Sequence, residues 1–101
     1  MGEKMIIMFT KDEIKRIHHT DDWSHITVDL HELTVKQARR FLNNIIAINR
    51  SDCHLRIIHG YHRGTAIKQM IWNDLNNPRI CSKDPVKGNP GQTMLSIQNA
   101  A

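Results

Sequence analysis

Strict alternation of apolar and polar residues defines one strand of this chain clearly. Ile26, Val28 and Leu30 alternate with polar neighbours, and this period of two is typical of a half-buried strand. Because the apolar side chains must face a core, Asp29 and His31 project together from the opposite face, about 7 Å apart by the rise of a strand.

Apolar spacing and cap residues predict the elements that follow. Residues 34–37 have the Thr-x-x-Gln pattern of a capping box, and apolar residues then recur three and four positions apart. This predicts an amphipathic helix of about four turns that ends near Asn49. A second strand is predicted from about 54 to 59, apolar in part on both faces as expected of a central strand. A second helix follows Thr65, and residues 76–78 (Asn-Asn-Pro) stop it.

The C-terminal quarter predicts two short strands, 80–82 and 93–98, joined by a loop from 83 to 91 that is rich in proline and glycine. The core order is then β-α-β-α-β-β. Because parallel crossovers are right-handed in nearly all proteins, both helices fall on one face of the sheet. We therefore expect an α/β fold of the α+β two-layer sandwich kind, with a mixed four-stranded sheet and one open face.

The first 25 residues predict an N-terminal extension ahead of a domain spanning residues 26–101. Met5–Phe9 favours a short strand, and Thr10 with Glu13 has the spacing of a capping box for a short helix. Residues 18–22 are polar and predict a connection without regular structure.

Composition favours an ordinary globular protein of one domain. The chain has 101 residues, of which 40% are hydrophobic and 24% charged. No apolar run approaches the length of a membrane span, so we expect a protein of the cytoplasm that does not bind a membrane. A monomer is the default expectation for its oligomeric state. Cys53 and Cys81 show no disulfide or CxxC spacing and are expected to be free thiols.

The charge is compatible with a polyanionic partner. Lys and Arg number 14 against 10 Asp and Glu, which gives a formal net charge of +4 and a pI near 9.4. Lys and Arg contacts to phosphates release counterions, so such an excess suits nucleic acid. The basic residues are spread over the whole chain, however, and many basic proteins bind no polyanion.

Two motifs lie where the first two core strands end. Asp29 and His31 end one strand and His59 ends the next, and ligands of such sheets bind beyond the carboxyl ends of strands. Neighbouring parallel strands are about 4.8 Å apart, so His31 and His59 are expected to approach each other. These residues alone leave three readings open: a structural role, a metal site formed by Asp29, His31 and His59, or acid–base chemistry.

The segment from Gly60 to Gly64 leads from that second strand into a helix. Such a loop presents backbone N–H groups at the positive end of the helix dipole, which suits a phosphate. Arg63 and Lys68 add positive charge, and Tyr61 offers a ring for stacking on a base. The same pattern also occurs in loops that are only turns.

Together these segments resemble the Smr (small MutS-related) domain family over residues 26–98. The resemblance depends on Val28-Asp-Leu-His31 followed by Leu33-Thr-Val-Lys-Gln-Ala38, on Ile57-Ile-His-Gly60 with Gly64, and on the turn 88–93 before the last strand. Two features depart from the family pattern. Glu32 stands where the family usually has glycine, and the second motif is His-Gly-Tyr-His-Arg-Gly instead of His-Gly-x-Gly.

The resemblance implies a fold like the C-terminal domain of translation initiation factor 3, and it implies binding and nicking or endonucleolytic cleavage of RNA or DNA. On this hypothesis His31 and His59 act as general base and acid, and Asp29 orients a histidine. Cleavage of DNA, which lacks the 2′-hydroxyl, favours a divalent ion such as Mg²⁺. The alternative is a binding module for nucleic acid or a ribonucleoprotein without catalysis. Both hypotheses use the same candidate contacts: Gly60, Tyr61, Arg63, Gly64, Thr65, Lys68, Arg39, Arg40 and Arg56.

Overall fold

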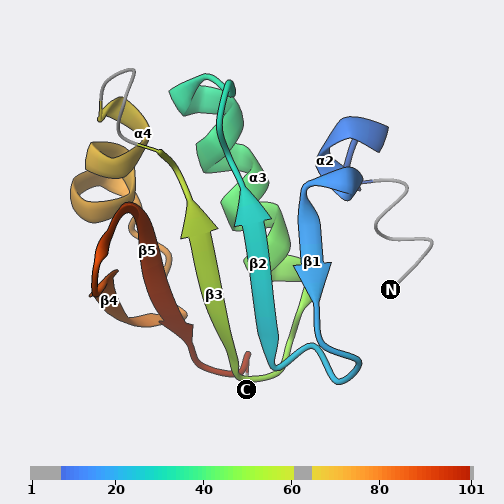
Figure 1. Cartoon of the computed structure of the whole chain (residues 1–101). Helices are drawn as coiled ribbons and strands as arrows, with labels where there is room; N and C mark the ends of the chain where they lie inside the picture. Colours follow the sequence, from blue (N-terminus) through green and yellow to red (C-terminus); the bar gives the residue numbers. More distant parts are fainter. Residues whose placement is uncertain (1–7, 61–64, 101) are drawn as a thin grey trace.

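A five-stranded mixed sheet forms the centre of the protein in the computed structural model, which describes residues 8–60 and 65–100 (Figure 1). The strands are β1 Ile17–His19, β2 His25–Asp29, β3 Cys53–Ile58, β4 Ile80–Val86 and β5 Asn89–Ile97, in the order β1-β2-β3-β5-β4. The helices are α2 Lys11–Lys15, α3 Val35–Ile48 and α4 Ala66–Gln69, which continues as the π-helix η1 Met70–Asp74. Strands β2 and β3 are parallel, and the other neighbours are antiparallel.

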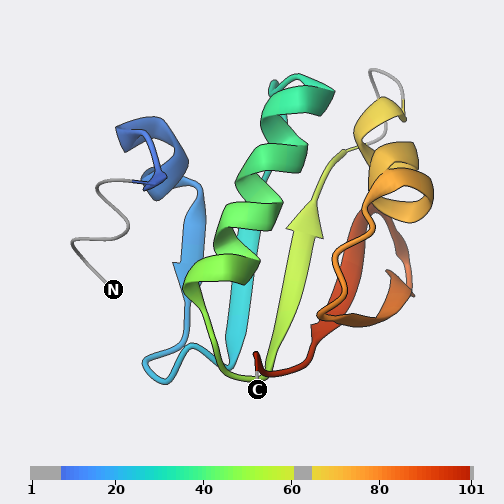
Figure 2. The same ribbon diagram turned by 180° about the vertical axis from the view of Figure 1, so that it is seen from behind.

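Helices α3 and α4 lie on one side of the sheet, as predicted, and the other side is open. They are behind the strands in Figure 1 and in front of them when the molecule is turned round in Figure 2. The capping box of α3 forms as predicted: the Thr34 hydroxyl accepts from the Gln37 N–H and the Gln37 side chain accepts from the Thr34 N–H. The core between the layers contains Phe9, Ile26, Val28, Leu30, Phe41, Leu42, Ile45, Ile46, Leu55, Ile57, Met70, Ile71, Leu75, Leu95 and Ile97.

The first strand of the sheet was not predicted from the sequence, so the sheet has five strands and not four. Residues 17–19 pair with β2, although Ile17 was expected in the short helix and residues 18–22 in a polar connection, and Ile17 lies opposite Val28. An edge strand needs only backbone pairing on one side, so its own side chains need not alternate. The helix after Thr10 is confirmed with its capping box. The expected strand at residues 5–9 is wrong at its described end, because Met8 is helical and Phe9 lies in a bend, while residues 5–7 lie outside the described residues. Phe9 packs edge-on against Phe41, with ring centroids 5.6 Å apart.

The loop expected at residues 83–91 is instead part of a hairpin. Strand β4 continues to Val86 and β5 begins at Asn89, and Gly88 adopts a φ of 76° in the turn between them. Pro85 is tolerated because β4 is an edge strand, where one side of the backbone needs no partner. Lys83 Nζ donates to carbonyl oxygens at the end of η1, including that of Leu75 at 3.0 Å, which satisfies groups that a helix end leaves unpaired.

Candidate functional site

A carboxylate–imidazole pair lies at the carboxyl end of β2. The His31 Nδ1–H donates to Asp29 Oδ1 at 2.5 Å, and the His31 backbone N–H donates to the same oxygen at 3.0 Å. An ionised carboxylate can only accept, so it fixes the proton on Nδ1 and leaves Nε2 unprotonated, and no side chain of residues 8–60 and 65–100 donates to it. The His31 side chain is 57% exposed. The arrangement is that of an exposed imidazole whose tautomer is set by a neighbouring carboxylate.

The charge of Asp29 is maintained by its surroundings. Burial raises the pKa of this carboxyl, but hydrogen bonds from the His31 side chain and N–H, together with the charges of His31 and Arg16, outweigh it and hold the pKa below its ordinary value. Asp29 is consequently ionised at neutral pH and able to accept from His31.

Arg16 fixes the backbone around this pair from the N-terminal segment. Its Nη1 donates to the carbonyl oxygens of Asp29 at 3.1 Å and His31 at 2.8 Å, and its Nε donates to Asp12 Oδ2 at 2.8 Å. The side chain is only 14% exposed. This contact spans 13 and 15 residues of sequence, and no spacing pattern pointed to it.

Arg56 supplies a positive charge on the same open face. It lies opposite Thr27 in the register of β2 and β3, two residues before the pair Asp29 and Ile58. Its Nη1 donates to Gln92 Oε1 at 3.0 Å, and Gln92 lies opposite Ile58 on β5. The guanidinium therefore reaches toward β5, which lies on the other side of β3 from Asp29.

His59 has a different environment from His31. Its Nδ1–H donates to the Gly60 carbonyl at 2.8 Å, and the Thr93 hydroxyl donates to its Nε2 at 2.9 Å. The Thr93 oxygen in turn accepts from Trp72 Nε1–H at 3.1 Å. Both ring nitrogens of His59 are thus engaged inside the protein, and the chain of donors fixes one neutral tautomer.

The two histidines lie on different sides of the sheet. His59 is 7% exposed and continues the core-facing positions Cys53, Leu55 and Ile57 of β3, whereas Asp29 belongs to the open face. The ends of β2 and β3 do meet, since the Leu30 N–H donates to the Ile58 oxygen at 2.8 Å. The structure therefore brings the two motifs to one edge without forming the facing histidine pair expected from strand spacing.

His59 is expected to make stability pH-dependent. Burial lowers its pKa, the hydrogen bond to Gly60 opposes this, and the charge of Lys68 lowers the pKa further. In the unfolded chain the ring gains a proton as the pH falls through about 6.5, whereas the folded protein resists it. The contribution of neutral His59 to the free energy of unfolding is therefore complete above about pH 6.5 and is lost as the pH falls below it.

Urea unfolding between pH 5 and 8 measures this effect. We expect the free energy of unfolding of the His59→Gln variant to fall less steeply below about pH 6.5 than that of the unsubstituted protein. Parallel curves for the two proteins would show that His59 is protonated equally in both states.

Comparison with known proteins identifies the family. The sequence model of the Smr domain matches residues 28–98. The chain belongs to the Smr domain family. This family is nucleic-acid-binding and nuclease-related, and the matched region contains Asp29, His31 and His59.

A solved structure agrees with this assignment. The crystal structure of the Smr domain of Thermus thermophilus MutS2 is similar to this Smr domain at 29% sequence identity and a TM-score of 0.61, over 71% of this chain and 96% of that one. A comparison with curated protein sequences finds no match. No helix in residues 8–60 and 65–100 is long and apolar enough to cross a membrane.

Glu32 occupies a backbone conformation that explains the glycine usual at this position in Smr domains. Its φ is 69°, in the left-handed region where a side chain is strained. The turn after His31 thus keeps a backbone shape that glycine adopts without strain, and Glu32 adopts it at a cost.

We expect Glu32→Gly to raise the free energy of unfolding by about 1 kcal/mol. Glycine relieves the backbone strain of the folded protein, and this gain is reduced because glycine also increases the conformational entropy of the unfolded chain. Glu32→Ala removes the same carboxylate but keeps the strain, so it serves as the matched control in urea unfolding. Equal stability of the two variants would contradict the explanation.

The other predicted contacts are divided between the two sides of the sheet. Arg39 and Arg40 are exposed on α3, in the helical layer, and Arg40 forms an ion pair with Glu13 at 2.8 Å. Arg56 is on the open face, so these arginines do not form one surface. Thr65 is exposed at the start of α4, and Lys68 is close enough to His59 for its charge to act on that ring.

The glycine motif after β3 is only partly described. Gly60 has a φ of 72°, and its N–H donates to the Gly91 carbonyl at 3.0 Å. This amide is therefore used within the fold and is not available to a phosphate, contrary to the expectation from sequence. Tyr61, Arg63 and Gly64 lie outside the described residues.

The metal site considered from sequence does not form in the described part of the chain. Within residues 8–60 and 65–100, no three side chains of His, Cys, Asp or Glu are placed to hold a metal ion. Asp29 and His31 are in contact, but His59 faces the core on the other side of the sheet.

Proposed function

We propose that this Smr domain is an endonuclease that cleaves RNA by transesterification at the Asp29–His31 pair. The observation that supports the proposal is the exposed imidazole of His31, oriented by an ionised carboxylate at 2.5 Å with Nε2 free. This arrangement can remove a proton from a hydroxyl group that is brought to the open edge of the sheet.

The ribose 2′-hydroxyl is the substrate group that suits this base. His31 Nε2 takes the hydroxyl proton, the 2′-oxygen attacks the adjacent phosphorus, and the bond from phosphorus to the 5′-oxygen breaks. The proton returns to the departing oxygen from the imidazolium or through water. The products are a 2′,3′-cyclic phosphate and a 5′-hydroxyl end. Asp29 stabilises the imidazolium that forms in between.

Residues around the pair provide positioning and charge. Arg56 lies on the same open face as Asp29, two residues earlier in the register, and is suited to bind a phosphate of the strand. Arg16 maintains the backbone that presents His31. His59 acts through its hydrogen bonds to Gly60 and Thr93, and we assign it a positioning role and not proton transfer.

The test is a cleavage assay on labelled single-stranded RNA, duplex DNA and branched DNA, each with EDTA or Mg²⁺. We expect RNA to be cut in EDTA with a 2′,3′-cyclic phosphate end, and an RNA with 2′-deoxyribose at the cleaved position to resist. Cleavage of DNA that requires Mg²⁺ would overturn the transesterification mechanism in favour of hydrolysis.

A binding module without catalysis is the second candidate, and the environment of His59 favours it. With both nitrogens of that ring engaged, residues 8–60 and 65–100 present one exposed imidazole at this edge and not two. On this hypothesis nucleic acid binds with strong salt dependence, Arg56→Ala weakens binding, and no substrate of the cleavage assay is cut.

We further propose that the protein acts in the cytoplasm as a monomer. The location is supported by Cys53 and Cys81, which are both free thiols, as is usual in a reducing compartment. Sedimentation of the purified protein tests the oligomeric state.

A further inference from the structure

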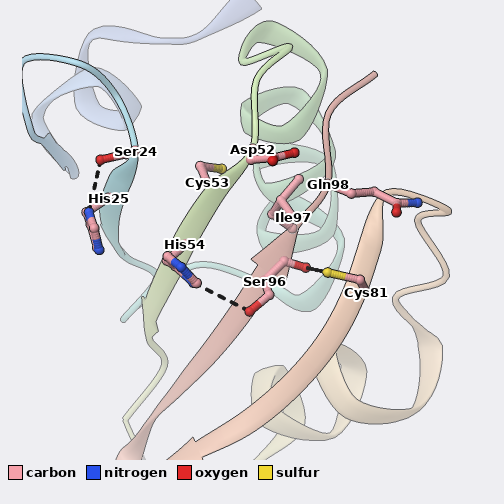
Figure 3. Close-up of a pocket in the computed structure, with 9 residues that line it drawn as sticks. All are labelled: Ser24, His25, Asp52, Cys53, His54, Cys81, Ser96, Ile97 and Gln98. Atoms are coloured by element: carbon pink, nitrogen blue, oxygen red, sulfur yellow. Dashed lines mark hydrogen bonds between the residues drawn. The ribbon is translucent and has the colours of Figure 1, made fainter. Parts of the chain in front are cut away.

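A hollow of about 410 Å³ lies at the opposite end of the sheet from Asp29 and His31. Its walls come from the amino ends of β2 and β3 and from the paired ends of β5 and β4 (Figure 3). His25 on β2 and His54 on β3 line it, and the two residues are directly opposite each other in the register of the strands. The site and the hollow thus share the two parallel strands.

The two imidazoles are both exposed and lie beside each other at a moderate tilt. Their ring centroids are 5.3 Å apart with planes inclined by 32°, within the range of about 4.5–7 Å seen for rings in contact. Serine hydroxyls lie beside both rings: Ser24 Oγ is 3.1 Å from His25 Nδ1, and Ser96 Oγ is 3.4 Å from His54 Nδ1. No base fits between the rings, but their outer surface offers a platform on which a base can stack.

The remaining walls suit the edge of a base and not a phosphate. Asp52 contributes a carboxylate, whose Oδ1 accepts from the Asn99 N–H. The lone pairs that remain on a carboxylate can accept from the N–H₂ group of a base, and its charge repels a phosphate. Gln98 contributes an amide whose Nε2 donates to the Pro78 carbonyl at 3.3 Å, and its second N–H and its oxygen can donate and accept. The lining is therefore that of a nucleobase pocket: stacking rings on one side and hydrogen-bonding groups on another.

The separation from the catalytic pair matches a short stretch of single strand. His25 and Asp29 are four residues apart on β2, which is about 13 Å by strand rise. This equals about four steps of a stacked strand at about 3.4 Å each, and fewer steps of an extended one. Arg56 lies on the open face between the two positions, opposite Thr27, where it can contact the intervening phosphates.

We propose that this hollow binds one unpaired base of the RNA, two to four nucleotides from the bond cleaved at His31. The inference rests on the proposed function for the position of cleavage, but binding of the base is a separate property. The site would give the enzyme a requirement for single-stranded RNA on one side of the cut.

The experiment uses a series of RNAs of one sequence, each with a single abasic position, stepped along both sides of the cleaved bond. For the unsubstituted protein we expect one position, two to four nucleotides away, at which loss of the base raises KM about tenfold with little change in kcat. In the His25→Ala/His54→Ala variant the intact RNA should have that raised KM, and the abasic position should have no further effect. His18→Ala removes an exposed histidine of β1 that does not line the hollow, and it should behave as the unsubstituted protein.

Binding of the same series to the His31→Ala variant, followed by fluorescence anisotropy, separates this inference from the proposed function. A position-specific loss of affinity without cleavage by the unsubstituted protein would retain the base pocket and overturn the nuclease. Cleavage with equal sensitivity to abasic positions in the unsubstituted protein and the double histidine variant would retain the nuclease and overturn the pocket.

Discussion

His31→Ala is expected to lower kcat for RNA cleavage by about 10² to 10⁴-fold, the usual contribution of a positioned general base. The ring is exposed and its removal leaves no buried group without a partner, so folding should be unaffected. Affinity for RNA should also change little, because phosphate contacts come from arginine and lysine. Single-turnover cleavage and anisotropy on the same RNA measure the two quantities separately.

Two variants make this result specific. Asp29→Asn retains the shape of the partner but replaces an acceptor with an amide that can donate, so His31 can take the wrong tautomer; kcat should fall by about 10²-fold or more. His18→Ala, an exposed histidine of the edge strand, should retain full activity. Loss of affinity in His31→Ala in proportion to its loss of rate would mean that the ring binds RNA and does not transfer protons.

The elements that repeat a simple period were predictable from the sequence. Alternation at residues 26–30 and the Thr34 capping box predict β2 and the start of α3, and the structure has both. Strand β1 was missed because its pairing is a backbone property and its sequence, Ile-His-His, has no period. The extent of the β4–β5 hairpin was missed because two prolines and two glycines suggested a loop, whereas only Gly88 has the turn conformation among these glycines.

The candidate site was predictable in part. The short spacing of Asp29 and His31 on a strand is enough to place them together, and their hydrogen bond agrees with it. The orientation of His59 was predictable, since it lies an even number of residues from Leu55 and Ile57 and so faces the core with them. Its position at the end of a strand suggested a site residue instead. Arg16 and Gln92 could not be found, because their contacts join segments far apart in sequence and depend on the complete fold.

Thr93 connects the packing of the core to the start of the glycine motif. It is fully buried on β5, and its single hydroxyl donates to His59 and accepts from Trp72. His59 in turn donates to the carbonyl of Gly60. A change at Thr93 therefore reaches Gly60 through one ring, without any contact to the open face where His31 lies.

Thr93→Val is expected to lower the free energy of unfolding by about 2–3 kcal/mol. Valine has nearly the same shape but leaves a buried imidazole nitrogen and a partly buried indole N–H without their partner, at about 1–3 kcal/mol for each buried group. Thr93→Ser retains the hydroxyl and loses one methyl group, at about 1 kcal/mol. Urea unfolding at pH 7.5 compares the three proteins, and ¹⁵N spectra of His59 report whether the proton stays on Nδ1. A valine variant as stable as the unsubstituted protein would mean that the hydroxyl contributes only its volume, and the assignment of His59 as a positioning residue through Thr93 would fail with it.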